Sequence, residues 1–280
     1  MPLSPPLIRP LLRLLRVTAP LLVLTACTST PATLQDGQWL WSSADRSVYL
    51  AARATDPGLR PGVWVSSISF DTTARQLVTR LALPPTLVPG PIAVVIRFED
   101  GMHQAWGRVP DAELAVATDS VVGRVLRLVR AAGVPVAEVQ LDYDCPVRRL
   151  PRWAAIVGTL TRGTLRNEEV WVTSLVAHLR EPEYGGLFRG RVAGHIVQVF
   201  DTGEDPTPAR VDELQHLLRR QQLPFRFGVG AFERRLGPDS TTNHLGWFAA
   251  RAGLARLPQY RGLWVFPAGR SWLAYRGRLQ

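Results

Sequence analysis

The sequence lacks the short motifs that mark several large enzyme classes. No Gly-x-Gly-x-x-Gly fingerprint follows the first apolar segment, no P-loop occurs, and no serine lies in a Gly-x-Ser-x-Gly elbow. The sequence therefore supports neither a dinucleotide site, nor a phosphate-binding loop, nor a serine nucleophile of the hydrolase type.

Histidine and cysteine are scarce. The five histidines include no pair with the spacing of metal ligands, so we expect no metal site and no bound cofactor. One of the two cysteines, Cys145, has no histidine near it in sequence, and the carboxylates beside it should raise the pKa of its thiol. We therefore do not expect a cysteine nucleophile.

Acidic residues are too few to balance the basic ones. All 33 basic residues are arginine, against 23 aspartates and glutamates, which gives a formal net charge of +10 at pH 7. Such a charge suits contact with anionic lipids, polyanionic glycans or nucleic acid. Because the basic residues are scattered along the sequence, we interpret them first as a solvated surface.

The longest apolar run near the N-terminus is too short to span a bilayer. Three arginines precede the run 17–24 and small residues follow it, which is the pattern of an export signal. The tetrapeptide Leu-Thr-Ala-Cys27 resembles the lipobox of bacterial lipoproteins. By that resemblance residues 1–26 are a signal peptide and Cys27 is the lipid-modified first residue. The alternative is an ordinary cleaved signal with an incidental cysteine.

The lipobox resemblance implies a place in the cell envelope. With Cys27 acylated, no disulfide can form within the chain, so the fold must rest on its hydrophobic core. Residues 27–36 then form a tether, and Thr28 does not resemble the aspartate that retains such proteins at the inner membrane. We therefore expect an exported monomer, lipid-anchored to the outer membrane and facing the periplasm, where nucleic acid is not a partner.

Residues 37–280 contain no linker or internal repeat and are interpreted as one α/β domain. Apolar segments recur with mostly helical segments between them, and strands that alternate with helices pair in parallel. We therefore predict a (β/α)8 TIM-like barrel, with a doubly wound open sheet as the alternative. The eight expected strands are 38–41, 62–70, 92–98, 136–144, 169–175, 195–200, 225–232 and 262–267.

Three segments show the periodicity of outer helices. The run 120–132 has Asp119 or Ser120 as its expected cap, and the run 207–221 begins with Thr207 as cap followed by Pro208. The third run is 149–161, with five apolar residues on one side.

Other helical units are less regular. Prolines interrupt the segment 72–89, and 181–194 is short and rich in glycine. Only about a dozen residues follow the eighth strand, and 270–276 has the pattern of a strand. We therefore expect the barrel to be incomplete, or covered differently, at the last helix.

One predicted strand carries a row of polar side chains. Within 136–144, Glu138, Gln140, Asp142 and Asp144 alternate with apolar residues, so all four point to one face. In a parallel barrel this face is the interior, and the carboxyl ends of the strands form the mouth where active sites lie. We expect Asp142 and Asp144 at this mouth. The alternative is a pair of solvated carboxylates at a strand end.

Residues of this kind suit a sugar site. Glycoside hydrolysis needs an acid for the leaving oxygen and a second group that stabilises the sugar cation, and aromatic rings cover the C–H surfaces of sugars. We predict Asp144 and Asp142 as catalytic residues. The predicted substrate-binding residues are Gln140, Arg97, Trp41, Gln198, Trp264 and Glu233. Trp41 and Trp264 also fit the packed wall of a barrel, and Gln198 also fits an internal hydrogen-bond partner of the acids.

The segment Gln140-Leu-Asp142-Tyr-Asp144-Cys-Pro146 and the helix after it resemble the central motif of an uncharacterised bacterial lipoprotein family. That family is a domain of unknown function grouped with glycoside-hydrolase-like TIM barrels. The alternating acids also resemble the Asp-x-Asp-x-Glu motif of chitinase-like glycoside hydrolases. If Asp142 and Asp144 match the two aspartates, Pro146 occupies the place of the acid. If Gln140 and Asp142 match them, Asp144 replaces the glutamate with a side chain one methylene shorter.

Two functions follow from these patterns. The first is a lipid-anchored barrel that binds and hydrolyses a polysaccharide, with Asp144 as the acid and Asp142 positioning it. The second is a non-catalytic envelope lipoprotein that uses the barrel as a glycan- or protein-binding module. A partner oxygen roughly 5 to 9 Å from Asp144 across an open cleft would favour hydrolysis. A carboxylate pair sealed by Arg97 would favour the binding module.

Overall fold

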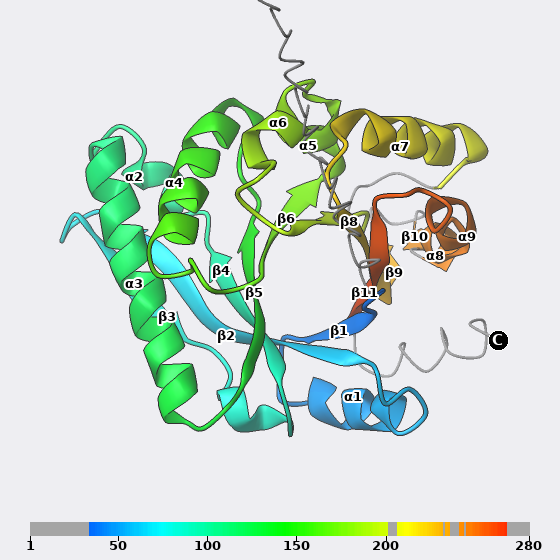
Figure 1. Ribbon diagram of the computed structural model, residues 1–280, viewed down its shortest axis with the longest axis horizontal. Helices are drawn as coiled ribbons and strands as arrows, with labels where there is room; N and C mark the ends of the chain where they lie inside the picture. Colours follow the sequence, from blue (N-terminus) through cyan, green and yellow to red (C-terminus); the bar gives the residue numbers. More distant parts are fainter. Residues whose placement is uncertain (1–33, 201–205, 232, 236–240, 244, 268–280) are drawn as a thin grey trace, which may run out of the picture. The chain divides into compact units, whose positions relative to one another are not determined.

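The computed structural model describes residues 34–267 except 201–205, 232, 236–240 and 244 (Figure 1). The predicted signal peptide, Cys27 and most of the tether lie outside this range, and so does the segment 270–276. Within the described part of the chain, no helix is long and apolar enough to cross a membrane.

Eight parallel strands form a closed barrel, which confirms the predicted fold and excludes the open sheet. The first strand, β1, pairs with both β2 and β11 and so closes the ring. In barrel order the strands are β1 (Gly37–Leu40), β2 (Arg60–Asp71), β4 (Ile92–Phe98), β5 (Val136–Tyr143), β6 (Val170–Leu175), β7 (Gly194–Gln198), β8 (Phe225–Ala231) and β11 (Tyr260–Pro267).

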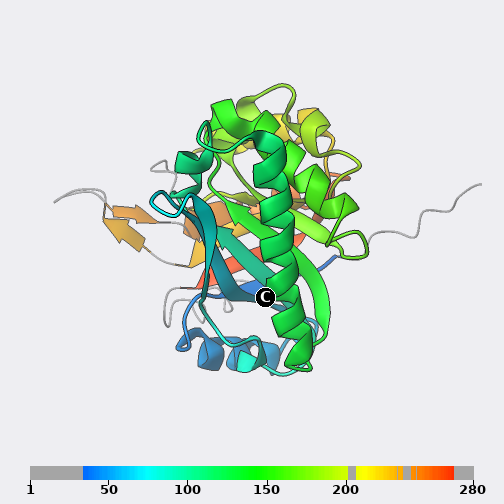
Figure 2. The same cartoon turned by 90° about the vertical axis from the view of Figure 1, so that its left-hand side faces the viewer.

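Helices surround the strands (Figure 1). The longest is α3, which runs along one side of the barrel (Figure 2). The helices are α1 (Asp45–Arg53), α2 (Met102–Ala105), α3 (Asp111–Ala131), α4 (Leu150–Arg162), α5 (Val176–Arg180), α6 (Tyr184–Phe188), α7 (Pro208–Gln221), α8 (Leu245–Ala249) and α9 (Arg251–Leu254), with 3₁₀ turns at Pro85–Leu87 and Val147–Arg149. A short antiparallel pair, β9 (Glu233–Arg235) and β10 (Thr241–Asn243), extends from the barrel (Figure 2).

Large aromatic side chains fill the barrel interior, and glycines make room for them. Trp39 and Trp264 pack together there with ring centroids 5.6 Å apart. A methyl group at Gly37 would lie 2.5 Å from the Trp264 ring, and one at Gly62 would lie 2.7 Å from both indoles. These strand glycines are therefore required by the close approach of the two tryptophans.

A second and larger apolar core lies between the strands and the helices. Val139, Leu141 and Tyr143 of β5 belong to it, as the alternating pattern predicts. The apolar side of α4 is buried as expected. All of these contacts and the closure of the ring lie within residues 37–267, so removing residues 1–27 removes no contact of the described barrel.

Helix boundaries depend on local capping. Thr207 accepts a hydrogen bond from the backbone N–H of Arg210 at 3.4 Å, and Pro208 is the first helical residue of α7, as predicted. The predicted start near Ser120 is wrong, because α3 begins at Asp111. Asp119 instead accepts a hydrogen bond from the backbone N–H of Thr164 at 2.9 Å, which ties α3 to the loop after α4.

The segment 72–89 forms a hairpin rather than the expected helical unit. Strand β3 (Gln76–Leu81) pairs antiparallel with the end of β2. The turn is stabilised by Asp71, whose side chain accepts from the N–H groups of Thr73 and Ala74, and Arg75 adopts a φ of 52°. Such local aspartate bonds compete with helix formation, and the prolines that follow prevent a helix further along.

Candidate functional site

The polar face of β5 runs through the barrel toward its mouth. Glu138 and Gln140 are completely buried, Asp142 is 3% exposed, and the side chain of Asp144 is 45% exposed. The predicted alternation is therefore correct, but the four side chains lie in different environments. Of the four, only Asp144 is substantially exposed to solvent.

Glu138 and Arg226 form a buried ion pair near the amino end of the barrel. Arg226 Nη1 and Nη2 lie 2.5 and 3.0 Å from the two carboxylate oxygens, and Arg60 adds a contact of 3.1 Å. The Arg226 guanidinium also lies 3.7 Å from the centroid of the Trp171 ring. Sequence reasoning missed this pair, although an arginine within the apolar run of β8 is a signal that a buried acid exists.

Gln140 and Trp264 belong to the barrel interior in this structure. Gln140 Oε1 accepts from Trp39 Nε1 at 2.7 Å, and its Nε2 donates to Glu138 at 2.8 Å. Trp264 is fully buried, and its Nε1 donates to the backbone oxygen of Gln35 at 3.2 Å. Both side chains are thus used within the fold, and their contact with a substrate stays a prediction.

The mouth brings Asp142, Asp144, Arg97 and Gln198 together. Parallel pairing of β4 with β5 places Arg97 beside Asp142, whose Oδ2 accepts from Arg97 Nη1 at 3.2 Å. Gln198 Nε2 donates to Asp142 Oδ1 at 3.2 Å from β7. Arg97 Nη2 also lies 3.7 Å from Asp144 Oδ2. One guanidinium therefore joins the two predicted catalytic carboxylates.

Burial raises the pKa of Asp142 to about 6, although Arg97 lowers it, and the nearby charge of Asp144 raises it further. A carboxyl with a pKa of about 6 changes its protonation state slightly below neutral pH. Asp142 is thus chemically able to act as a proton donor or acceptor, but its side chain is covered.

Aromatic rings form one side of the mouth. Trp41 follows β1 and is half-buried, and its ring centroid lies 4.8 Å from that of Trp64 and 5.2 Å from that of Phe266. The Arg97 guanidinium lies 5.3 Å from the Trp41 centroid, a cation–π contact. Sequence reasoning missed Trp64. The alternation along β2 is a signal that could have found it, because Arg60 and Gly62 point into the barrel and Trp64 follows two residues later.

Glu233 is the last of the predicted substrate-binding residues. The backbone of Glu233 begins β9, but its side chain lies outside the described residues. Cys145 is buried, and burial raises the pKa of its thiol to about 12, whereas Arg149 lowers it. The expected direction of this shift is correct, but its main cause is burial rather than the neighbouring carboxylates. Within the described part of the chain, no group of three or more His, Cys, Asp or Glu residues could hold a metal ion.

No protein-family model matches this chain. No curated protein matches it either. Several solved structures share its fold. A glycoside hydrolase family 18 chitinase from Pseudoalteromonas aurantia superposes with a TM-score of 0.57 at 12% identity, over 88% of this chain and 100% of the other. The Bacillus cereus spore cortex-lytic enzyme SleL gives a TM-score of 0.57 at 12% identity, over 87% and 74% of the chains.

An inhibitor protein shares this fold as well. The xylanase–α-amylase inhibitor protein, solved with trehalose, gives a TM-score of 0.53 at 10% identity over 88% of this chain and 96% of its own. At such low identity these likenesses show the fold alone, a TIM barrel.

Proposed function

We propose that this protein is an envelope lipoprotein whose barrel binds a polysaccharide at the carboxyl ends of its strands. The observation that carries the proposal is the meeting of the half-buried Trp41 ring with Arg97, which joins Asp142 and Asp144. A sugar ring presents apolar C–H faces and polar hydroxyl groups. An aromatic face beside charged hydrogen-bonding groups can contact both. The partly exposed Asp144 would accept hydrogen bonds from sugar hydroxyls, and Arg97 would donate them.

Binding is favoured over hydrolysis by the arrangement of Asp142. Its two oxygens already accept from Arg97 and Gln198, and its side chain is 3% exposed. A general acid or base must reach a substrate atom within hydrogen-bond distance. Asp142 supports the shape and charge of the mouth without direct access to a glycosidic oxygen.

Hydrolysis is the second candidate, and one observation favours it. The pKa of Asp142 is raised to about 6, and a partly exposed carboxylate, Asp144, shares the Arg97 guanidinium with it. Two carboxyl groups in different environments are the usual basis of acid and base roles in glycosidases. In this version Asp144 contacts the leaving oxygen, and Asp142 tunes its charge through Arg97.

The similar structures suggest which glycans to test first. Two of those compared are named as a chitinase and a cortex-lytic enzyme, and the inhibitor protein was solved with trehalose. Chitin oligosaccharides are therefore the first probes, followed by a panel of envelope and biofilm polysaccharides.

The location is part of the proposal and rests on Cys27. The run of arginines, the apolar segment and the Leu-Thr-Ala-Cys27 sequence support export and acylation. Expression of the full chain with Cys27→Ser should move the protein from the outer-membrane fraction to a soluble fraction when the membranes are washed at high salt, which releases proteins held by charge alone. If wild type and variant fractionate alike, the anchor is wrong.

The deciding experiment uses the soluble chain that begins after Cys27. Wild type, Asp144→Asn and the control Asp100→Asn, an exposed acid just after β4, are compared on immobilised glycans and in glycan-release assays. The binding proposal predicts retention without release, weakened by Asp144→Asn but not by Asp100→Asn. Release that only Asp144→Asn abolishes would establish hydrolysis instead. If wild type neither retains nor releases any glycan, the site is not a glycan site.

A further inference from the structure

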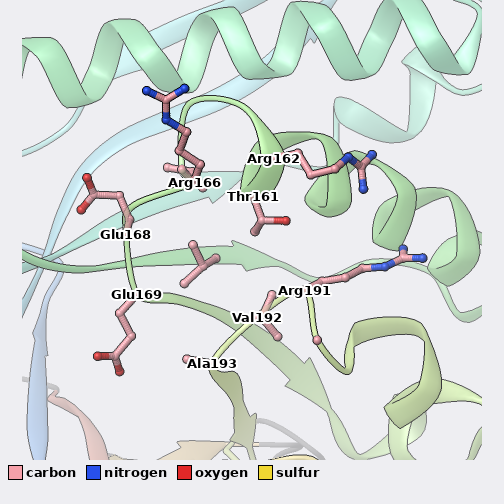
Figure 3. Close-up of a pocket in the computed structure, with 11 residues that line it drawn as sticks. Thr161, Arg162, Arg166, Glu168, Glu169, Arg191, Val192 and Ala193 are labelled. Carbon is pink, nitrogen blue, oxygen red and sulfur yellow. The ribbon is translucent and has the colours of Figure 1, made fainter.

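Three arginines line a pocket at the amino end of the barrel, opposite the mouth. The pocket has a volume of about 420 Å³ and lies beside Val170, the first residue of β6, and Ala193, just before β7. Arg162 ends α4, Arg166 lies in the loop before β6, and Arg191 lies in the loop before β7 (Figure 3). We call these three residues the arginine pocket.

Two of these guanidinium groups converge. A methyl group at Gly158 of α4 would lie 3.3 Å from Arg162 Nη1 and 3.6 Å from Arg191 Nη1. Both side chains extend to the same side in Figure 3, whereas the Arg166 side chain extends to the opposite side. Two guanidinium groups that both lie next to Gly158 repel each other, and an anion bound between them would remove this repulsion.

The glutamates of the pocket have other partners. Glu168 pairs with Arg130, while Glu169 accepts from Trp171 Nε1 at 2.7 Å and lies 3.6 Å from Arg226. Among the residues that the structure describes, no carboxylate forms an ion pair with any arginine of the pocket. In the described part of the chain, the Arg191 guanidinium donates to the backbone oxygen of Ala154 at 2.8 Å and to no carboxylate. The positive charge of the pocket is thus unneutralised within the described chain.

Other arginines extend this charge over the same end of the barrel. Four of them donate to backbone carbonyls rather than to carboxylates, and their charges therefore remain: Arg53, Arg189, Arg220 and Arg261. The nearby carboxylate of Asp36 pairs with Arg251. The amino end of the barrel is therefore a surface of excess positive charge.

The chain enters the barrel at this end. The backbone N–H of Gln35 donates to Arg261 at 2.9 Å, its side chain donates to Gly58 at 2.8 Å, and Leu34 is 64% exposed. In a parallel barrel the amino ends of β1, β6 and β7 lie at one end. Any anchor that precedes Leu34 is therefore attached at the arginine-rich end.

We propose that the arginine pocket binds the phosphate headgroup of an anionic phospholipid and docks the barrel on the membrane by its amino end. Arginine pairs with phosphate through two parallel hydrogen bonds, and basic residues near a surface strengthen attachment to anionic lipid. The docked barrel directs Asp144 and the mouth away from the lipid, toward a glycan. The orientation of the mouth rests on the proposed lipid anchor. Binding of the phosphate headgroup by the arginine pocket does not depend on that anchor.

Vesicle binding by the soluble chain that begins after Cys27 tests the proposal. Wild type should sediment with vesicles of phosphatidylglycerol and phosphatidylcholine, less so at high salt, and not with phosphatidylcholine alone. Arg162→Glu with Arg191→Glu should weaken this binding roughly 30-fold or more, and lysines at both positions should retain most of it. The matched control is Arg108→Glu with Arg148→Glu, which makes the same charge change at exposed positions near the carboxyl end.

Three results would overturn the proposal: wild type without preference for anionic vesicles, equal losses in the pocket and control variants, or arginine-pocket-dependent binding of dextran sulfate but not of vesicles. Thermal melting of each variant checks that it is folded. Glycan retention separates the two proposals, because the pocket variant should retain glycan like wild type, and Asp144→Asn should bind vesicles like wild type.

Discussion

Glu138 and Arg226 face each other inside the barrel and form a bidentate ion pair that is buried from solvent. Their side chains are 0% and 3% exposed, and the guanidinium lies against the faces of Trp171 and Trp264. The pair closes the interior beneath Gln140, so the polar row on β5 is structural at its start and available to solvent only at its end.

Glu138→Ala should destabilise the fold by about 3–5 kcal/mol, because it removes the buried bidentate partner of Arg226 and leaves only the partly exposed Glu169 carboxylate, 3.6 Å away, as a counter-charge. Chemical denaturation measures this loss. The control, Glu99→Ala, removes an exposed partner of Arg80 and should cost at most about 1 kcal/mol. Similar losses for both variants would contradict the structural role of the buried pair.

Arg97→Met should raise the pKa of Asp142 above about 6, since Arg97 is the main group that lowers it. A carboxyl-carbon NMR titration of Asp142 measures the shift directly. Arg80→Met is a suitable control, because Arg80 pairs with Glu99 and does not contact Asp142. An unchanged or lower pKa in the Arg97 variant would show that the guanidinium does not act on this carboxyl.

Trp41→Ala and Trp264→Ala should have different effects. Trp264 is fully buried between the strands, so its removal should cost about 3–5 kcal/mol of folding stability. Trp41 is half-buried at the mouth, and its removal should weaken glycan binding by about 2 kcal/mol with a smaller loss of stability. Denaturation together with affinity on immobilised glycan distinguishes them. Unchanged glycan affinity in Trp41→Ala would remove this ring from the proposed site.

His195 and Asp142 should have opposite effects on stability as pH falls. Burial lowers the pKa of His195 to about 3, so the unfolded state takes up that proton first, and stability is lost below about pH 6.5. The raised pKa of Asp142 means that the folded state takes up its proton first, so stability is gained from about pH 6 down to 3.8. Each contributes about 1.4 kcal/mol per pH unit within its range.

Equilibrium unfolding of wild type, Asp142→Asn and His195→Gln at several pH values measures these two contributions. Between about pH 6 and pH 4, Asp142→Asn should lose stability more steeply than wild type, and His195→Gln less steeply. Parallel curves for the three proteins would mean that neither group changes its proton affinity on folding.

Strand positions were predictable because their signals are local. Apolar runs such as 92–98 match β4, and Thr207 with Pro208 marks the start of α7. Local signals gave wrong predictions where one local pattern opposed another. The periodic residues of α3 suggested a start near Ser120, but the helix continues back to Asp111 through less apolar residues. The segment 72–89 formed a hairpin because Asp71 stabilises a turn.

The sequence by itself determined which side chains of β5 share a face, because alternation along a strand is a property of consecutive residues. Only the tertiary structure decided what each of them does. Glu138 meets Arg226, 88 residues away, and Gln140 meets Trp39, 101 residues away. The same holds for Arg162, Arg166 and Arg191, which come from separate segments of the sequence but line one pocket at the amino end of the barrel. Closure of the ring brings these groups together, and periodicity does not specify partners that are distant in the chain.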